Sequence, residues 1–105
     1  MQINDAQIGA MINYSLGEIK QKTKVSDSIP NPVKKVIRDV KASCSCTNVN
    51  HLNDRINFTY EAPEIQQKTM EHPVWKGYLE VYKLITITYT DLTTESIQIH
   101  AKIVP

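Results

Sequence analysis

Two cysteines, Cys44 and Cys46, are the residues of this chain whose type and spacing could do chemistry. They lie one residue apart, and His51 follows five residues after the second. Thiolate sulfur and imidazole nitrogen are ligands for soft ions such as Cu(I) and Zn(II). A closed zinc site needs four ligands, and the other candidates, His72 and His100, are distant in the sequence.

A redox pair and a packing device are the other two interpretations of Cys44 and Cys46. Residues two apart in a strand face the same side, so both thiols would pack together as small hydrophobic groups. A disulfide across one residue is strained and closes a loop too short to remove much unfolded-state entropy. We therefore predict reduced, packed thiols and no metal or other cofactor. Cys44, Cys46 and His51 remain the alternative metal ligands.

Other catalytic patterns are missing from the sequence. It contains no Ser-His-Asp order, no Gly-rich phosphate loop and no paired carboxylates. His72 and His100 are expected at the surface, and the second alternates with the apolar Ile99 in its strand. The chain is therefore predicted not to be an enzyme.

The length and composition of the chain indicate one globular domain over residues 1–105. Hydrophobic residues make 41% and charged residues 22% of the chain, and the net charge is +1. That balance gives no field suited to nucleic acid or an anionic membrane. No segment approaches the roughly twenty apolar residues of a membrane span. The N-terminus lacks a signal peptide pattern, so either the protein stays in the cytoplasm where it is made or a leader has been removed. The initial Met favours the first of these expectations.

Alternating apolar and polar residues predict several strands. The clearest pair is residues 79–89 and 97–103, joined by a turn at Asp91–Glu95, which together predict a β-hairpin. Lys83 interrupts the apolar face of the first strand and suggests a bend or an edge there.

Three further segments are expected to be extended. Ile56–Tyr60 alternates and is stopped by Ala62-Pro63, and Val33–Ala42 follows the proline pair of residues 29–32, which suits a loop or strand entry. Residues 8–16 fit both a strand and a helical stripe, and two glycines favour the strand. Residues 48–54 are expected to form a polar loop. Residues 64–75 should be a long connection with one helical turn at 65–70.

Short strands separated by turns predict an all-β fold, an antiparallel β-sandwich of about seven strands. Its predicted core gathers inward residues of four segments: Val40, Phe58, Ile85, Ile87, Ile97 and Ile99.

In sequence order these segments resemble the immunoglobulin-like family known as domain of unknown function 1573, related to Hydin-type and major-sperm-protein-like sandwiches. Family members carry a Pro-led strand running into Ser-Cys-Gly-Cys-Thr, followed by Ile-x-Val-x-Tyr, Lys-x-Ile-x-Val and Leu-x-Ile-x-Gly-x-Val strands. The counterparts here are Asn31–Val33 leading to Val40–Thr47, then Ile56–Tyr60, Lys83–Thr88 and Ile97–Val104.

The sequence departs from the family pattern at three places. Ser45 replaces the glycine between the cysteines, Asn50–Arg55 replaces a Pro-Gly-rich turn, and Ala101 stands at a glycine position. Bacterial members are commonly exported, whereas phage members lack leaders and are often small virion proteins. The resemblance therefore implies an immunoglobulin-like form of the antiparallel β-sandwich, and a phage-encoded member located in the virion.

The expected function is a non-enzymatic structural or adhesive protein of a phage virion: a capsid decoration, neck or tail component. Its partners would be other virion proteins or copies of itself in a multi-copy assembly. The alternatives are an immunoglobulin-like binding module of a cellular envelope assembly, or a small metal-binding protein built on the two cysteines. Because aromatic residues and loops carry contacts, the interface candidates are Trp75, Tyr78, Tyr82, Asn48, Asn50 and His51.

Overall fold

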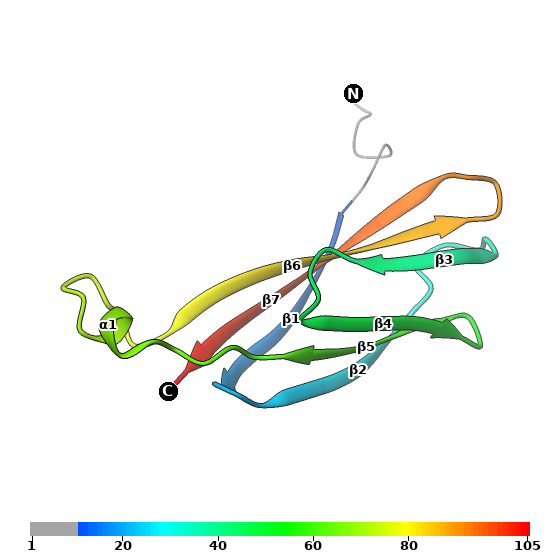
Figure 1. The fold of residues 1–105 in the computed structure, drawn as a ribbon. Helices are drawn as coiled ribbons and strands as arrows, with labels where there is room; N and C mark the ends of the chain where they lie inside the picture. The colour runs from blue at the N-terminus through cyan, green and yellow to red at the C-terminus, as the bar shows by residue number, and fades with distance from the viewer. Residues whose placement is uncertain (1–10) are drawn as a thin grey trace, which may run out of the picture.

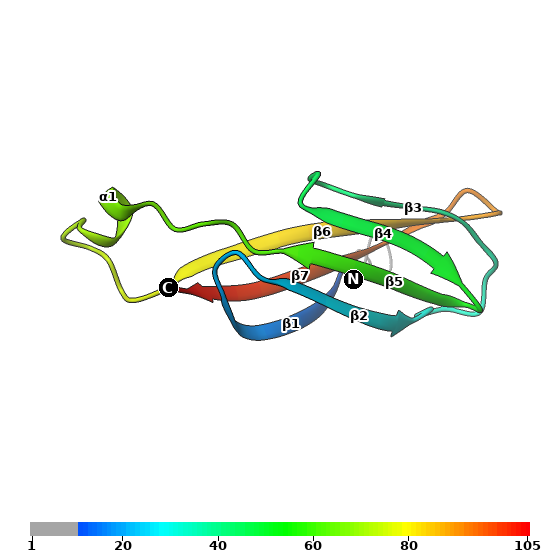
Figure 2. The ribbon, with the colours of Figure 1, turned by 60° about the horizontal axis from the view of Figure 1, so that its bottom comes forward.

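The computed structural model describes residues 11–105, which form seven strands and one short helix (Figure 1). The strands lie in two sheets that pack face to face, as the turned view shows (Figure 2). The elements are β1 (Met11–Lys20), β2 (Lys24–Pro30), β3 (Ile37–Ala42), β4 (Thr47–Leu52), β5 (Arg55–Glu61), α1 (Gln67–Met70), β6 (Leu79–Tyr89) and β7 (Thr94–Val104). The prediction of an all-β sandwich of about seven strands is confirmed.

The larger sheet has the strand order β1-β7-β6-β3. Its centre is the predicted hairpin of β6 and β7, which pair antiparallel from Leu79↔Ile103 to Thr88↔Thr94. The N-terminal segment is a strand as predicted, although Ile8 and Ala10 of that prediction lie outside the described residues. β1 pairs with β7 in parallel, so the purely antiparallel arrangement was wrong for this one pair.

The smaller sheet has the order β2-β5-β4, and it contains one strand that was not predicted and one that corrects a prediction. Residues 24–30 form β2, because Val25 and Ile29 turn inward while charged and hydroxyl residues between them hid the alternation. The predicted polar loop 48–54 is instead mostly strand β4, paired in register with β5. Only Asn53 and Asp54 turn the chain, with φ of 55° and 61°, the left-handed conformation that a two-residue hairpin loop requires.

The two-sheet topology matches that of immunoglobulin domains. Strands β2, β5 and β4 take the places of B, E and D, and β3, β6 and β7 take those of C, F and G. β3 is shorter at its start than predicted, since residues 31–36 form the connection from β2.

The hydrophobic core lies between the sheets and contains every residue predicted for it. Ile56, Ile85, Ile87, Ile97 and Ile103 are fully shielded from solvent, at 0% exposure. The alternation of each strand therefore delivers one face to a common core, which is the main source of stability for such a sandwich. The full buried cluster also includes Ile29, Ile37, Val40, Phe58, Tyr60, Ala62, Ile65, Tyr89, Ile99 and Ala101.

The sandwich is closed along its two long sides by different means. On the β1–β2 side, Tyr14 packs edge-on against Phe58 at 6.0 Å between ring centroids, and its hydroxyl donates to the carboxylate of Asp27. On the other side the chain passes from β3 to β4 through residues 43–46, so these two strands run beside each other across the sheets (Figure 1). This β3–β4 connection, residues 43–46, is here called the cysteine corner, because it carries both cysteines.

The connection between β5 and β6 is long, as predicted, and its helical turn is α1. It extends past one end of the smaller sheet, beside the start of β6 (Figure 1). Among residues 11–105, no helix has the length and apolar character needed to span a membrane.

Candidate functional site: the cysteine corner and the Trp75 cleft

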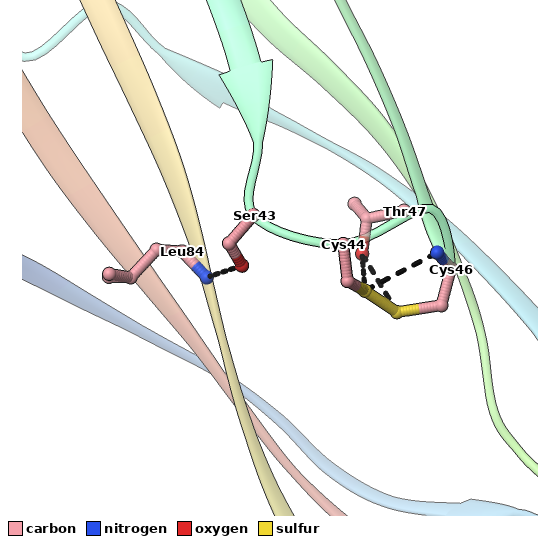
Figure 3. The surroundings of a disulfide bond; sticks show 5 residues. All are labelled: Ser43, Cys44, Cys46, Thr47 and Leu84. Carbon is pink, nitrogen blue, oxygen red and sulfur yellow. Dashed lines mark hydrogen bonds between the residues drawn. A yellow bond between two sulfur atoms is a disulfide. The ribbon is translucent and has the colours of Figure 1, made fainter.

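Cys44 and Cys46 form a disulfide, which corrects the prediction of reduced thiols (Figure 3). The prediction assumed a strand, in which the two side chains would lie side by side without bonding. The chain instead bends at residues 43–46, and the two Cα atoms lie 5.3 Å apart, within the ordinary range for a disulfide. The local turn therefore brings the two sulfurs within bonding distance, which the alternation argument did not foresee.

Hydrogen bonds hold this corner to both sheets. The Ser43 amide donates to the Leu84 carbonyl at 2.8 Å, and the Leu84 amide donates to the Ser43 hydroxyl at 3.0 Å, which extends the β3–β6 pairing by one residue (Figure 3). On the smaller sheet, the Glu61 amide donates to the Cys46 carbonyl at 2.9 Å. The disulfide thus lies in a corner whose backbone is fixed at both ends.

Thr47 is a buried polar residue directly beside the disulfide. Its side chain is 5% exposed, and its hydroxyl oxygen lies 4.0 Å from the Cys44 sulfur and 3.8 Å from the Cys46 sulfur. The Cys46 amide also donates to the Cys44 sulfur at 3.3 Å. The sulfur of Cys44 therefore accepts a backbone hydrogen bond and has a hydroxyl within reach.

The alternative metal site does not assemble in this geometry. Both sulfurs are bonded to each other, and His51 lies five residues further along β4, roughly 16 Å away for an extended chain. Within residues 11–105 there is no cluster of three or more His, Cys, Asp or Glu side chains that could hold an ion.

A cleft beside the cysteine pair, here called the disulfide cleft, lies between the sheets and was not anticipated from the sequence. It measures about 530 Å³. Lys83, the residue that interrupts the apolar face of β6, points into it, so that interruption was the available signal. The lining residues are Lys22, Cys46, Tyr60, Glu61, Ala62, Pro63, Glu64, Val81 and Lys83.

Two of the aromatic interface candidates lie at a different cleft, here called the Trp75 cleft. This shallow cleft of about 700 Å³ lies between the α1 connection and the start of β6, and both Trp75 and Tyr78 line it. Trp75 is held by a turn in which its amide donates to the His72 carbonyl at 2.9 Å. It is half-buried and packs against the core, so its side chain anchors the connection and also lines the cleft. The remaining lining residues are Lys68, Thr69, His72, Val74, Lys76, Leu79 and Glu80.

Tyr82 continues the same outward face of β6 beyond the cleft. Its ring stacks on His100 at 4.7 Å between centroids and is 55% exposed. Glu80 accepts a hydrogen bond from His100 at 2.7 Å, and this bond is the main reason that the pKa of the Glu80 carboxyl is lowered. On the neighbouring row, the Lys102 ammonium lies 4.7 Å from the centre of the Tyr78 ring. His100 is at the surface, as predicted, and orders this aromatic face.

Asn48, Asn50 and His51 lie apart from the aromatic candidates. Asn48 and Asn50 are exposed on the outer face of the smaller sheet, where the Asn57 amide donates to the Asn50 side chain at 3.2 Å. His51 borders a separate hollow beside the start of β3. The six predicted interface residues therefore divide among three places: the aromatic face of β6, the outer face of the smaller sheet and the hollow beside β3.

Comparison with known proteins gives one remote structural likeness. No protein-family model matches the chain, and no curated protein sequence matches it. A solved structure of a 2,6-sialyltransferase from Photobacterium sp. aligns over 90% of this chain and 18% of its own, with 8% identity and a TM-score of 0.46. The chain thus spans less than a fifth of that enzyme, and the likeness carries no conclusion about activity.

Proposed function

We propose that this chain is a non-enzymatic structural protein that docks in several copies onto a larger assembly, and that the assembly is a phage virion. The Trp75 cleft is the observation that carries the docking. Trp and Tyr contribute the largest share of binding energy at protein interfaces, and here they line an open apolar hollow on a rigid sandwich. The virion assignment rests on the resemblance of the sequence to an immunoglobulin-like family with phage members.

The docking surface joins the Trp75 cleft to the outward aromatic face of β6. Val74 is 70% exposed and Tyr82 is 55% exposed, so both have apolar area to lose on contact with a partner. A stable interface buries roughly 1,200–2,000 Å² in total, more than this cleft can supply. A second element must therefore take part, and the exposed edge strand β4 with Asn48 and Asn50 is the candidate.

Incorporation into particles tests this function. Trp75→Ala and Tyr82→Ser should each lower the fraction of chain that co-sediments with particles from a producing host. Leu92→Ala is the matched control, since that side chain is 67% exposed and lies in the β6–β7 turn, at the other end of β6 from the Trp75 cleft. Thermal melting separates docking from folding, because Tyr82→Ser removes an exposed ring only. Unchanged incorporation of both variants would contradict the proposal.

The disulfide favours one alternative, an immunoglobulin-like binding module of a cellular envelope assembly. Disulfides persist in the periplasm and at cell or virion surfaces and are rare in the cytosol. Cell fractionation distinguishes the two settings, since an envelope module co-fractionates with periplasm or membranes in cells that carry no phage. Recovery only with particles supports the virion.

A further inference from the structure

The disulfide and the cleft beside it have the arrangement of a reactive site. We infer that Cys44–Cys46 undergoes thiol–disulfide exchange with a cysteine thiol of another protein, in which Cys46 is attacked and Cys44 leaves. Cys46 lines the disulfide cleft, whereas Cys44 does not. An incoming sulfur that enters the cleft therefore meets Cys46 first. This exchange does not require that the chain dock in several copies.

The groups around Cys44 suit it to leave as a thiolate. The Cys46 amide already donates to the Cys44 sulfur at 3.3 Å. The buried Thr47 hydroxyl lies near both sulfurs, 4.0 Å from that of Cys44 and 3.8 Å from that of Cys46, and can turn toward Cys44 once that sulfur carries the charge. Hydrogen bonds to a charged acceptor are stronger than those to a neutral one. A leaving thiolate that is better stabilised departs faster. The corner thus supplies donors to the one sulfur that would carry negative charge after attack.

The exchange balances without an added oxidant. A thiolate of the incoming cysteine attacks the Cys46 sulfur, a new sulfur–sulfur bond forms, and the Cys44–Cys46 bond breaks as its electron pair passes to Cys44. The products are a mixed disulfide at Cys46 and a Cys44 thiolate. Attack by the Cys44 thiolate on Cys46 reverses the step and releases the partner thiol.

The cleft fits a peptide cysteine better than a small thiol. Its volume of about 530 Å³ exceeds that of a single side chain. Tyr60, Ala62, Pro63 and Val81 give it apolar walls for the residues next to the incoming cysteine. Two cations, Lys22 and Lys83, and two anions, Glu61 and Glu64, complete the lining. Their charges cancel, so the cleft does not select for the free charged groups of glutathione.

The test uses the oxidised full-length chain and a capped pentapeptide with one central cysteine, with glutathione as the second probe. Samples are quenched with acid and N-ethylmaleimide, and the adduct is located by fragment mass spectrometry. We expect the peptide on Cys46 and maleimide on Cys44. Preferential adducts on Cys44, or equal adducts on both, would overturn the assignment. Faster reaction with glutathione than with the peptide would overturn the choice of a protein cysteine.

Thr47 gives a matched pair of variants. Thr47→Val keeps the shape and removes the hydroxyl, and should slow exchange by about three- to tenfold. Thr47→Ser keeps the hydroxyl and should restore most of the rate. Equal rates for the Val variant and wild type would show that this hydroxyl does not assist Cys44.

An oxidised peptide spanning residues 42–48 serves as the unfolded reference. If it shows the same preference for Cys46, the selectivity does not come from the fold and the inference fails.

Discussion

The hydroxyl of Tyr89 donates a hydrogen bond to the side-chain oxygen of Asn31 across 3.0 Å, joining the end of β6 to the loop that follows β2. The Asn31 amide in turn donates to the Lys35 carbonyl at 2.8 Å and to the Asp54 carboxylate at 2.7 Å. One asparagine thus ties together both sheets and the β4–β5 turn. Burial, with smaller effects from nearby carboxylates, raises the pKa of Tyr89 to about 12.

Stability should therefore fall at high pH. The unfolded state loses the Tyr89 proton near pH 10, the ordinary value, while the folded state keeps it to about 12. The contribution is complete below pH 10 and is lost as pH rises toward 12, by on the order of 2 kcal/mol. Urea unfolding across this window measures it. Tyr89→Phe should flatten the decline and cost about 1 kcal/mol at neutral pH. Parallel pH curves for the two proteins would contradict this account.

Ile87 reports on the core. It is 0% exposed near the end of β6, so Ile87→Ala should lower the free energy of unfolding by about 2–5 kcal/mol. Thr88→Ala, on the opposite face of the same strand, should cost less than about 0.5 kcal/mol. Chemical denaturation of both variants measures the difference. Similar losses for the two would mean that the face assignment of β6 is wrong.

Leu92 occupies a backbone conformation that suits glycine. The Leu92 amide donates to the Tyr89 carbonyl at 2.9 Å, and its φ is 70°, as at the left-handed position of a three-residue hairpin loop. The side chain is 67% exposed, so little packing is lost on its removal. Leu92→Gly should raise stability by about 0.5–1 kcal/mol. Thr90→Gly in the same loop should lower it by a similar amount. If the melting temperatures of both variants shift in the same direction, the backbone at Leu92 is not strained.

The disulfide should contribute little to global stability. Its closed loop holds only Cys44 to Cys46, and the loop-entropy relation gives about 1.6 kcal/mol for three residues. The double variant Cys44→Ser, Cys46→Ser should therefore stay folded and lose about 1–2 kcal/mol in denaturant unfolding. Wild-type protein under a phosphine reductant should match it. A loss above about 3 kcal/mol would show that the bond holds the two sheets together.

The sequence predicted those elements whose alternation was long and uninterrupted. In β6 and β7 the apolar face is nearly continuous, so period two fixed strand, face and pairing together. β4 was not predicted because it is an edge strand in which only Thr47 and Val49 are shielded from solvent, and its asparagines resemble those of a loop. Its hairpin turn uses Asn53 and Asp54 without the glycine that usually marks such turns.

The site was predicted less well than the fold. Trp75 and Tyr78, both named as interface candidates, line one cleft because they are close in sequence. The disulfide was missed because its formation depends on how the chain turns at residues 43–46. The alternation of apolar and polar residues does not encode that turn. The disulfide cleft was missed because it joins Cys46 to residues of β5 and β6 that are distant in the chain.

Association through the Trp75 cleft is the central claim, and the mass of the chain in native extracts tests it most directly. Size exclusion with light scattering should find the wild-type chain in a complex well above its 12.0 kDa, and Trp75→Ala with Tyr82→Ser should shift it to the monomer. The Leu92→Ala control should remain in the complex. A folded wild-type chain that stays monomeric in every native extract, or a double variant that assembles as well as wild type, would contradict the claim.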